Sequence, residues 1–116
     1  MVQNIFHTEQ KVVQEINYIF CSDEYLLKIN QTALNHDYYT DIITFPLSAI
    51  NEPIEAEIYI SIDRVKENSA INHTSFSNEI ERVIAHGALH LCGYKDKTKK
   101  DIEEMRSKES FYINSI

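Results

Sequence analysis

The segment from residue 78 to residue 96, NEIERVIAHGALHLCGYKD, limits the fold most because it predicts a helix that is apolar on nearly every side. One side of this helix carries Ile80, Ile84, Gly87 and Leu91. Other apolar residues fill most of the remaining circumference, and a helix of that kind is buried. We therefore expect a buried central helix over about 78–92, ended by Gly93 in a left-handed conformation.

Two histidines on this helix need partners, because a buried imidazole without one is costly. His86 and His90 are four residues apart, so they lie one above the other on one side of the helix. A metal ion uses such a pair best, since both ring nitrogens can converge on one point. Gly93 permits a sharp turn, after which Asp96 can return as a third ligand. Three protein ligands with an open position predict a catalytic rather than a structural metal.

The spacing His86-x3-His90-x2-Gly93-x2-Asp96 is similar to the zinc-protease pattern H-E-x-x-H-x-x-G-x-x-H. The protease has its general base immediately after the first histidine, where this chain has Gly87. The pattern therefore indicates a metal site that is not a peptidase.

Two other interpretations of the segment stay open. The histidines could be core residues with satisfied hydrogen bonds, and Asp96 a turn residue. The metal could be purely structural, although such sites normally have four ligands. Cys92 is not expected to be the fourth, because it should point into the core.

The rest of the chain predicts one α+β domain over residues 1–116. We expect a small mixed sheet of about three or four strands with helices mainly on one face. Ser22 or Asp23 can cap the first helix, Asp63 the second, and Thr98 with Asp101 forms a capping box for the last. Residues 2–7 could be an edge strand. The expected strands are 16–21, 40–45 and 56–62, and the other helices are 24–35, 64–72 and 98–112.

Composition excludes several classes of function. The 116 residues include 11 Lys plus Arg against 18 Asp plus Glu, so a net charge of −7 does not support nucleic-acid binding through bulk charge alone. Two cysteines are no disulfide framework and favour a reducing compartment. No apolar stretch approaches the roughly 20 residues of a membrane span, and no signal peptide is visible, so we expect a cytoplasmic protein.

The stretch HGALHLCGYKD resembles the signature of the YbeY family of rRNA-maturation endoribonucleases, H-G-x-L-H-L-x-G-Y-D-H. TDIITFP at 40–46 is similar to the family's T-D-V-L-S-F-P, and AEIYI at 56–60 to its G-D-I-x-I. The resemblance covers about residues 22–113. It implies one zinc ion per chain, bound by His86, His90 and the residue at position 96, with catalysis dependent on His86.

The resemblance also implies an activity and partners. The family cleaves single-stranded RNA in 16S rRNA 3′-end maturation and takes part in ribosome quality control, so the expected partners are the 16S precursor and the small ribosomal subunit. Asp96 replaces the family's third histidine, and zinc accepts carboxylate oxygen at nearly the same distance. The family places a catalytic arginine shortly before the T-D strand, where this chain has none and His36 is the basic candidate.

RNA contacts require local positive charge. Six of the 11 basic residues fall between 95 and 108. The expected RNA contacts are three of these, Lys97, Lys99 and Lys100, together with His36. The alternative for these lysines is a solvated helix face. Tyrosines such as Tyr38 and Tyr39 could stack on unpaired bases, or could fill the edges of the core.

Other functions remain possible on the sequence alone. One is a non-catalytic ribosome- or protein-binding module with a vestigial metal site, which the missing arginine favours. Another is a metal hydrolase of a non-RNA substrate, and a peptidase is the weakest, because Gly87 replaces its glutamate. Turnover of denatured 16S precursor fragments separates an enzyme from a binding module.

Overall fold

The central strand of the sheet is β3 (Ile54–Ser61), and it pairs on both sides. The computed structural model describes residues 1–114, and within them the strand order is β1-β3-β2. β1 (Val13–Cys21) runs parallel to β3, and β2 (Ile42–Pro46) runs antiparallel to it. Ile58 and Ile60 alternate with more polar residues and are fully buried, as a sheet with one face on the core requires. The expected mixed sheet is confirmed.

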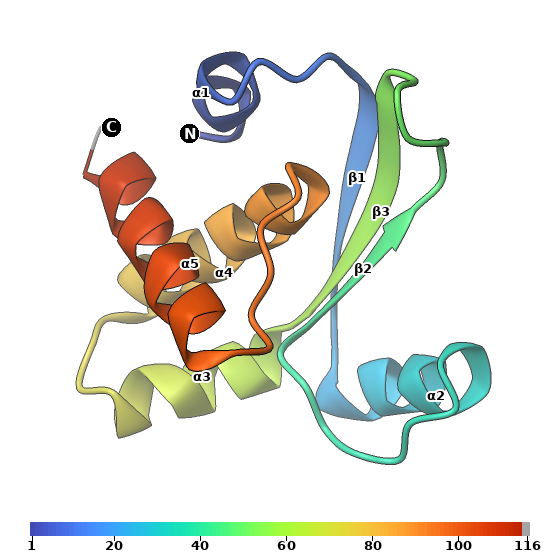
Figure 1. Cartoon of the computed structure of the whole chain (residues 1–116). Coiled ribbons are helices and arrows are strands. Elements are labelled where there is room, and N and C mark those ends of the chain that lie inside the picture. Colours follow the sequence, from blue (N-terminus) through green and yellow to red (C-terminus); the bar gives the residue numbers. More distant parts are fainter. Residues whose placement is uncertain (115–116) are drawn as a thin grey trace.

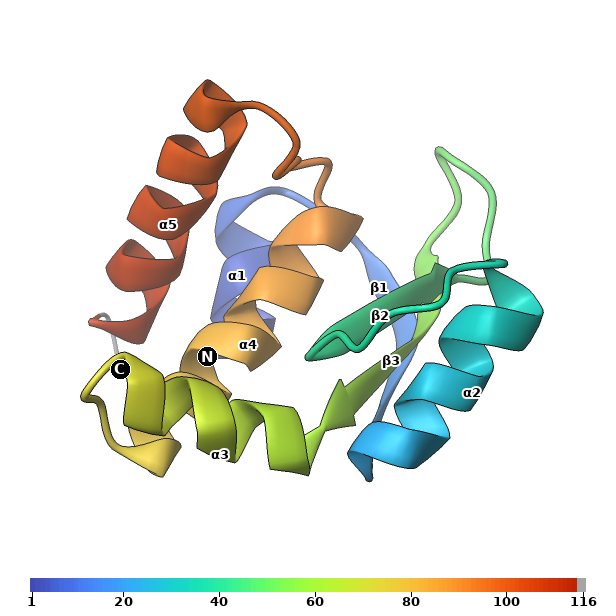
Figure 2. The ribbon, with the colours of Figure 1, turned by 90° about the horizontal axis from the view of Figure 1, so that it is seen from below.

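In the described part of the chain most helices lie on one side of this sheet, and α2 (Asp23–Ala33) lies on the other (Figures 1 and 2). α4 (Phe76–Leu91) crosses the sheet closely and has α1 (Val2–Thr8), α3 (Ile62–Ile71) and α5 (Lys99–Ile113) around it. The predicted α+β class, with helices mainly on one face and a buried central helix, is therefore confirmed. No helix in the described part of the chain has the length and apolar character needed to cross a membrane.

Hydroxyl side chains begin most of these helices. Ser22 and Ser75 accept hydrogen bonds from the backbone of α2 and α4, and Thr98 with Asp101 forms the predicted capping box of α5. The prediction that Asp63 caps α3 is wrong. β3 passes directly into α3, so Ser61 is the cap and accepts from the Arg64 backbone N–H at 3.1 Å. Asp63 lies in the first turn instead.

The prediction of an edge strand over residues 2–7 is also wrong, because this segment is helix α1. Ile5 and Phe6 are adjacent in sequence and both are buried, in a core cluster with Ala85, Ala88 and Leu89 of α4. An edge strand would have pointed these neighbours to opposite faces. α1 has no side-chain N-cap, which removed the usual sequence signal for a helix start.

Close packing of α4 on the sheet fixes the position of its histidines. A Cβ atom at Gly87 would lie 2.9 Å from Ile42 Cδ1 and 3.2 Å from two Ile58 methyl carbons, so a larger residue here would have to push the ends of these two side chains aside. At the other end of α4, Gly93 has φ +104°, the left-handed conformation that the sequence predicted. The chain then turns back, so that residues after Gly93 pass the same side of α4 as the histidines.

Candidate metal centre

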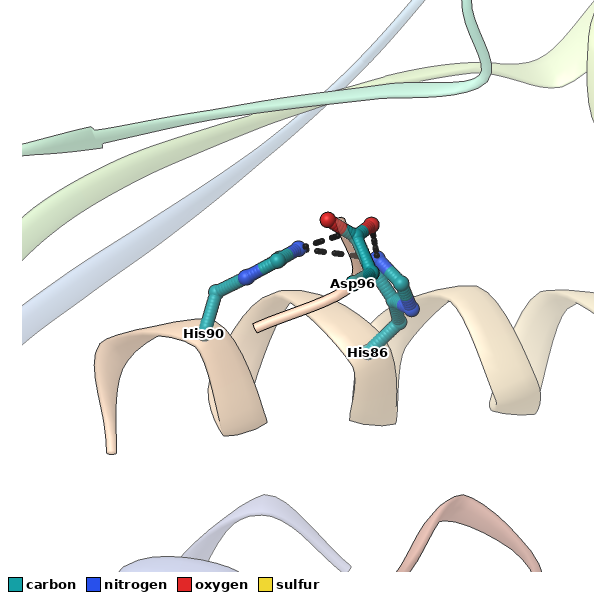
Figure 3. Close-up of side chains that lie close together, drawn as sticks. All are labelled: His86, His90 and Asp96. Atoms are coloured by element: carbon teal, nitrogen blue, oxygen red, sulfur yellow. Dashed lines mark hydrogen bonds and ion pairs between the residues drawn. The ribbon is translucent and has the colours of Figure 1, made fainter. Parts of the chain in front are cut away.

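His86, His90 and Asp96 come together on the sheet-facing side of α4 (Figure 3). Their closest atoms are the two Nε2 atoms, 2.9 Å apart, and Asp96 Oδ2, which lies 3.2 Å from His86 Nε2 and 3.4 Å from His90 Nε2. The histidine side chains are 22% and 29% exposed and that of Asp96 is 43% exposed, so the cluster is open to solvent on one side. The structure thus brings the three predicted ligands together.

Each histidine is held through its other ring nitrogen. His86 Nδ1 lies 2.7 Å from Glu109 Oε2, and His90 Nδ1 lies 3.0 Å from the backbone carbonyl oxygen of Tyr94. A carboxylate and a carbonyl only accept hydrogen bonds, so both Nδ1 atoms carry the proton. In the neutral rings both Nε2 atoms therefore present lone pairs to each other and to the Asp96 carboxylate. A positive charge at that point satisfies the three lone pairs, and it can be a further proton on one of the Nε2 atoms or a bound metal ion.

The partner of His86 belongs to a buried charged network. Glu109 is 4% exposed, and its other oxygen accepts from Arg82 Nη1 at 2.9 Å. Arg82 Nη2 also donates to Ser110 Oγ at 3.1 Å. Burial of the His86 ring opposes protonation, but the hydrogen bond and charge of Glu109, with Asp96 and Asp41 nearby, raise the pKa of His86 above its ordinary value. The network thus favours a positive charge at His86.

The donor set and its spacing fit a zinc ion. Two imidazole nitrogens and one carboxylate oxygen are ligands that zinc takes, and with metal–ligand distances of about 2.0–2.2 Å a tetrahedral site places its ligand atoms about 3.4 Å apart. The three separations here are 2.9, 3.2 and 3.4 Å. Each histidine also has the second hydrogen bond that orients metal ligands in proteins. The fit supports the metal-binding role that the sequence assigned to these residues, and that role stays a prediction.

A groove with a volume of about 1160 Å³ leads away from the three residues. It runs along β2, the loop between β2 and β3, and the segment that joins α2 to β2. Asp41 lines it near the histidines, and burial raises the pKa of this carboxyl while His86 partly offsets the effect. His36 lines the groove as well. The predicted RNA contacts Lys97, Lys99 and Lys100 are exposed around the start of α5, outside the residues that line this groove.

Two predictions about neighbouring residues can be compared with the geometry. A residue with a Cβ at position 87 would have to displace the ends of the Ile42 and Ile58 side chains, so the structure has glycine in a crowded place where the protease pattern has its glutamate. Cys92 lies outside the ligand cluster and packs against the core formed by α1, α4 and α5, as predicted.

Sequence reasoning missed the two groups that orient the histidines. Glu109 had a signal, because it lies on the same helical stripe as Met105 and Tyr112, and a carboxylate on a buried stripe indicates a buried partner. Arg82 lies one turn before His86 on α4 and points to the same partner. The Tyr94 carbonyl is backbone and has no signal in the side-chain pattern.

Comparisons with known proteins match this chain to one family. The family model described as Endoribonuclease YbeY matches residues 1–116. The Endoribonuclease YbeY of Cytophaga hutchinsonii is 56% identical over 108 residues, which are 93% of this chain and 76% of that protein. The one from Flavobacterium johnsoniae is 55% identical over 102 residues, 88% of this chain and 73% of that protein.

A solved structure shows the same fold. The solution structure of TM1509 from Thermotoga maritima has a TM-score of 0.69 and 32% identity, and the match covers 97% of this chain and 73% of that chain. The family model spans every residue of the sequence, and the relatives match most of it at more than half identity. On these grounds the chain belongs to the YbeY family of endoribonucleases.

Proposed function

We propose that this protein is a zinc-dependent endoribonuclease that cleaves single-stranded RNA during 16S rRNA maturation. The observation that carries the proposal is the convergence of His86 Nε2, His90 Nε2 and Asp96 Oδ2, three lone pairs within 3.4 Å of one another. A cation between them resolves the repulsion. Membership of an endoribonuclease family makes RNA the substrate.

The residues of the site have separate roles in this proposal. His86, His90 and Asp96 hold one zinc ion, and Glu109 and the Tyr94 carbonyl fix the rings so that both Nε2 atoms face it. When bound, the ion supplies Lewis acidity to a phosphoryl oxygen and lowers the pKa of water toward neutrality. His86 is the ligand on which catalysis depends most, because it alone is backed by a buried charge.

RNA contacts come from two places in this proposal. Lys97, Lys99 and Lys100 at the start of α5 attract the phosphate backbone, and His36 contacts the strand inside the groove. The further partners are the 16S precursor and the small ribosomal subunit, which places the protein in the cytoplasm. Residues 1–116 act as one domain.

Turnover tests the proposal directly. Wild-type protein loaded with zinc is incubated with denatured 16S precursor fragments, beside His86→Ala and a duplex RNA of the same sequence. We expect cleavage of the single strand by the wild type alone. Full cleavage with no metal bound would contradict zinc dependence, and binding without cleavage would replace the enzyme by a non-catalytic module.

The chemistry of the products identifies the nucleophile. Attack by water leaves a 2′-hydroxyl intact, whereas attack by the RNA's own 2′-hydroxyl gives a 2′,3′-cyclic phosphate. A substrate with 2′-deoxyribose at the cleaved position is cut in the first case and resists in the second.

A further inference from the structure

Two aromatic rings form a small platform in the groove, on the segment between α2 and β2. His36 and Tyr38 stack with their ring centroids 5.2 Å apart and their planes 21° from parallel. The Tyr38 hydroxyl lies 3.0 Å from His36 Nδ1, which ties the two rings together. Both residues line the groove that contains His86, His90 and Asp96, and Tyr38 is 56% exposed. We call this pair the His36–Tyr38 platform.

The platform is held in place by one buried residue, Asn30. Asn30 is 1% exposed, its side-chain Nδ2 donates to the Tyr38 backbone carbonyl at 2.9 Å, and its backbone carbonyl oxygen accepts from the His36 backbone N–H at 2.9 Å. Asn35 supplies the turn between them with φ 56°, a conformation that asparagine tolerates. These hydrogen bonds hold the segment in one conformation before a ligand binds. Binding therefore does not carry the entropic cost of ordering the segment.

Charge along the groove argues against phosphate attraction as the main source of binding there. Outside the metal ligands, the groove is lined by three carboxylates, of Asp41, Glu52 and Glu55, and by two basic side chains, of Lys11 and His36. A nucleobase is uncharged and has two aromatic faces, so it can bind such a surface where a bare phosphate chain is repelled. The platform offers the matching chemistry.

We propose that the His36–Tyr38 platform is a binding subsite for one unpaired nucleobase of the RNA substrate. The base stacks on the exposed ring while the strand continues along the groove toward His86, His90 and Asp96. A base in a duplex cannot reach such a platform, so the subsite selects single-stranded RNA. The inference rests on the proposed function. It adds that the far part of the groove recognises an unpaired nucleobase of the substrate.

Equilibrium binding tests the subsite without any need for catalysis. Metal-free wild type, Tyr38→Ala, Tyr38→Phe and Tyr25→Ala are titrated into a fluorescent short oligoadenylate and into a matched strand of abasic ribose phosphates. Tyr25 is a suitable control because it is 52% exposed on α2 and does not line the groove. Stacking on one side chain predicts that Tyr38→Ala weakens oligoadenylate binding by about 5- to 150-fold. Tyr38→Phe and Tyr25→Ala keep wild-type affinity, and the abasic strand binds all four proteins alike.

Two results would overturn the subsite. One is an unchanged affinity of Tyr38→Ala, and the other is an equal loss for the abasic strand, which would show that the change acts on the backbone contacts. Thermal unfolding of each variant verifies that the fold is intact. If Tyr38→Ala unfolds, Tyr38→Trp is titrated as well, and its aromatic ring should keep the binding of oligoadenylate. Cleavage by the wild type is measured separately. If the wild type cleaves RNA and Tyr38→Ala binds normally, the subsite fails while the proposed function stands.

Discussion

His86 and His90 occupy equivalent positions one turn apart on α4, yet they are supported in different ways. His86 donates to the carboxylate of Glu109, which comes from α5 and is itself paired with Arg82. His90 donates to the backbone carbonyl of Tyr94, only four residues further along the chain. The first support is charged, buried and distant in sequence, and the second is neutral and local.

This difference shows which parts of the chain the site depends on. The turn at Gly93 places the Tyr94 carbonyl, so the support of His90 forms as soon as α4 ends correctly. The support of His86 exists only when α5 packs on α4. Substitutions on α5 should therefore affect one ligand and leave the other in place.

The largest loss of zinc binding is expected from removal of a ligand ring itself, where the difference between the two supports no longer matters. His86→Ala and His90→Ala each remove one of the three converging donors, and both should lose zinc binding completely at micromolar zinc. Isothermal titration with zinc measures this. A histidine variant that binds zinc with wild-type affinity would show that its ring is not a ligand.

A smaller loss of zinc affinity, acting through His86 alone, is expected from Glu109→Gln. The amide still accepts from His86 Nδ1 but carries no charge, and loss of a metal ligand's orienting partner typically costs about 10- to 100-fold in metal affinity. Competition against a chelator measures the change. Glu104→Gln is the matched control on the same helix, because Glu104 is exposed. Equal zinc affinity in Glu109→Gln and the control would mean that Glu109 does not tune the site.

The same pair of proteins should differ in pH dependence. Zinc binds only neutral imidazole, and Glu109 raises the pKa of His86 above its ordinary 6.5. As the pH falls through this raised pKa, protons displace zinc from the wild type before they displace it from Glu109→Gln. The affinity ratio of the two proteins should therefore shrink toward acid pH. A ratio that does not change with pH would contradict the assigned cause of the shift.

The pH dependence of the stability of the metal-free protein provides a second test of the raised pKa of His86. A histidine with a raised pKa in the folded state stabilises the fold below its unfolded pKa, and that contribution is lost as the pH rises through the folded value. Urea unfolding of the metal-free wild type should thus give a lower free energy of unfolding at pH 8 than at pH 6, beyond the change in Glu109→Gln. The opposite trend in this difference would contradict a raised pKa.

The smallest effect on metal binding is expected from Tyr94→Phe. The substitution removes the hydroxyl that donates to Glu9 Oε1 at 2.9 Å, and loss of one such hydrogen bond costs about 0.5–1.5 kcal/mol of stability. The backbone carbonyl that accepts from His90 is unchanged, so zinc affinity should stay near that of the wild type. A loss as large as that of Glu109→Gln would remove the distinction between the two supports.

The sequence predicted those parts of the site that are set by local spacing. His86 and His90 share a helix face, and Gly93 allows Asp96 to return, so three ligands within eleven residues follow from helix periodicity and one turn. The stripe shared with Met105 and Tyr112 indicates that Glu109 has a buried partner, but it does not identify His86 as that partner, because the contact between α4 and α5 depends on packing across the chain. The wrong prediction for α1 has the same cause. The burial of both Ile5 and Phe6 is set by the core that they pack against and not by the pattern of their own short segment.

Metal content is the most direct test of the claim that His86, His90 and Asp96 form a zinc site. The protein is purified without added metal as wild type, Asp96→Ala and Glu103→Ala, the last an exposed residue of α5, and each is measured by elemental analysis. We predict close to one zinc per chain in the wild type and in Glu103→Ala, and a sharply reduced content in Asp96→Ala. A wild type without metal that also takes up none on zinc addition, or an Asp96→Ala protein that retains its full zinc, would contradict the site described here.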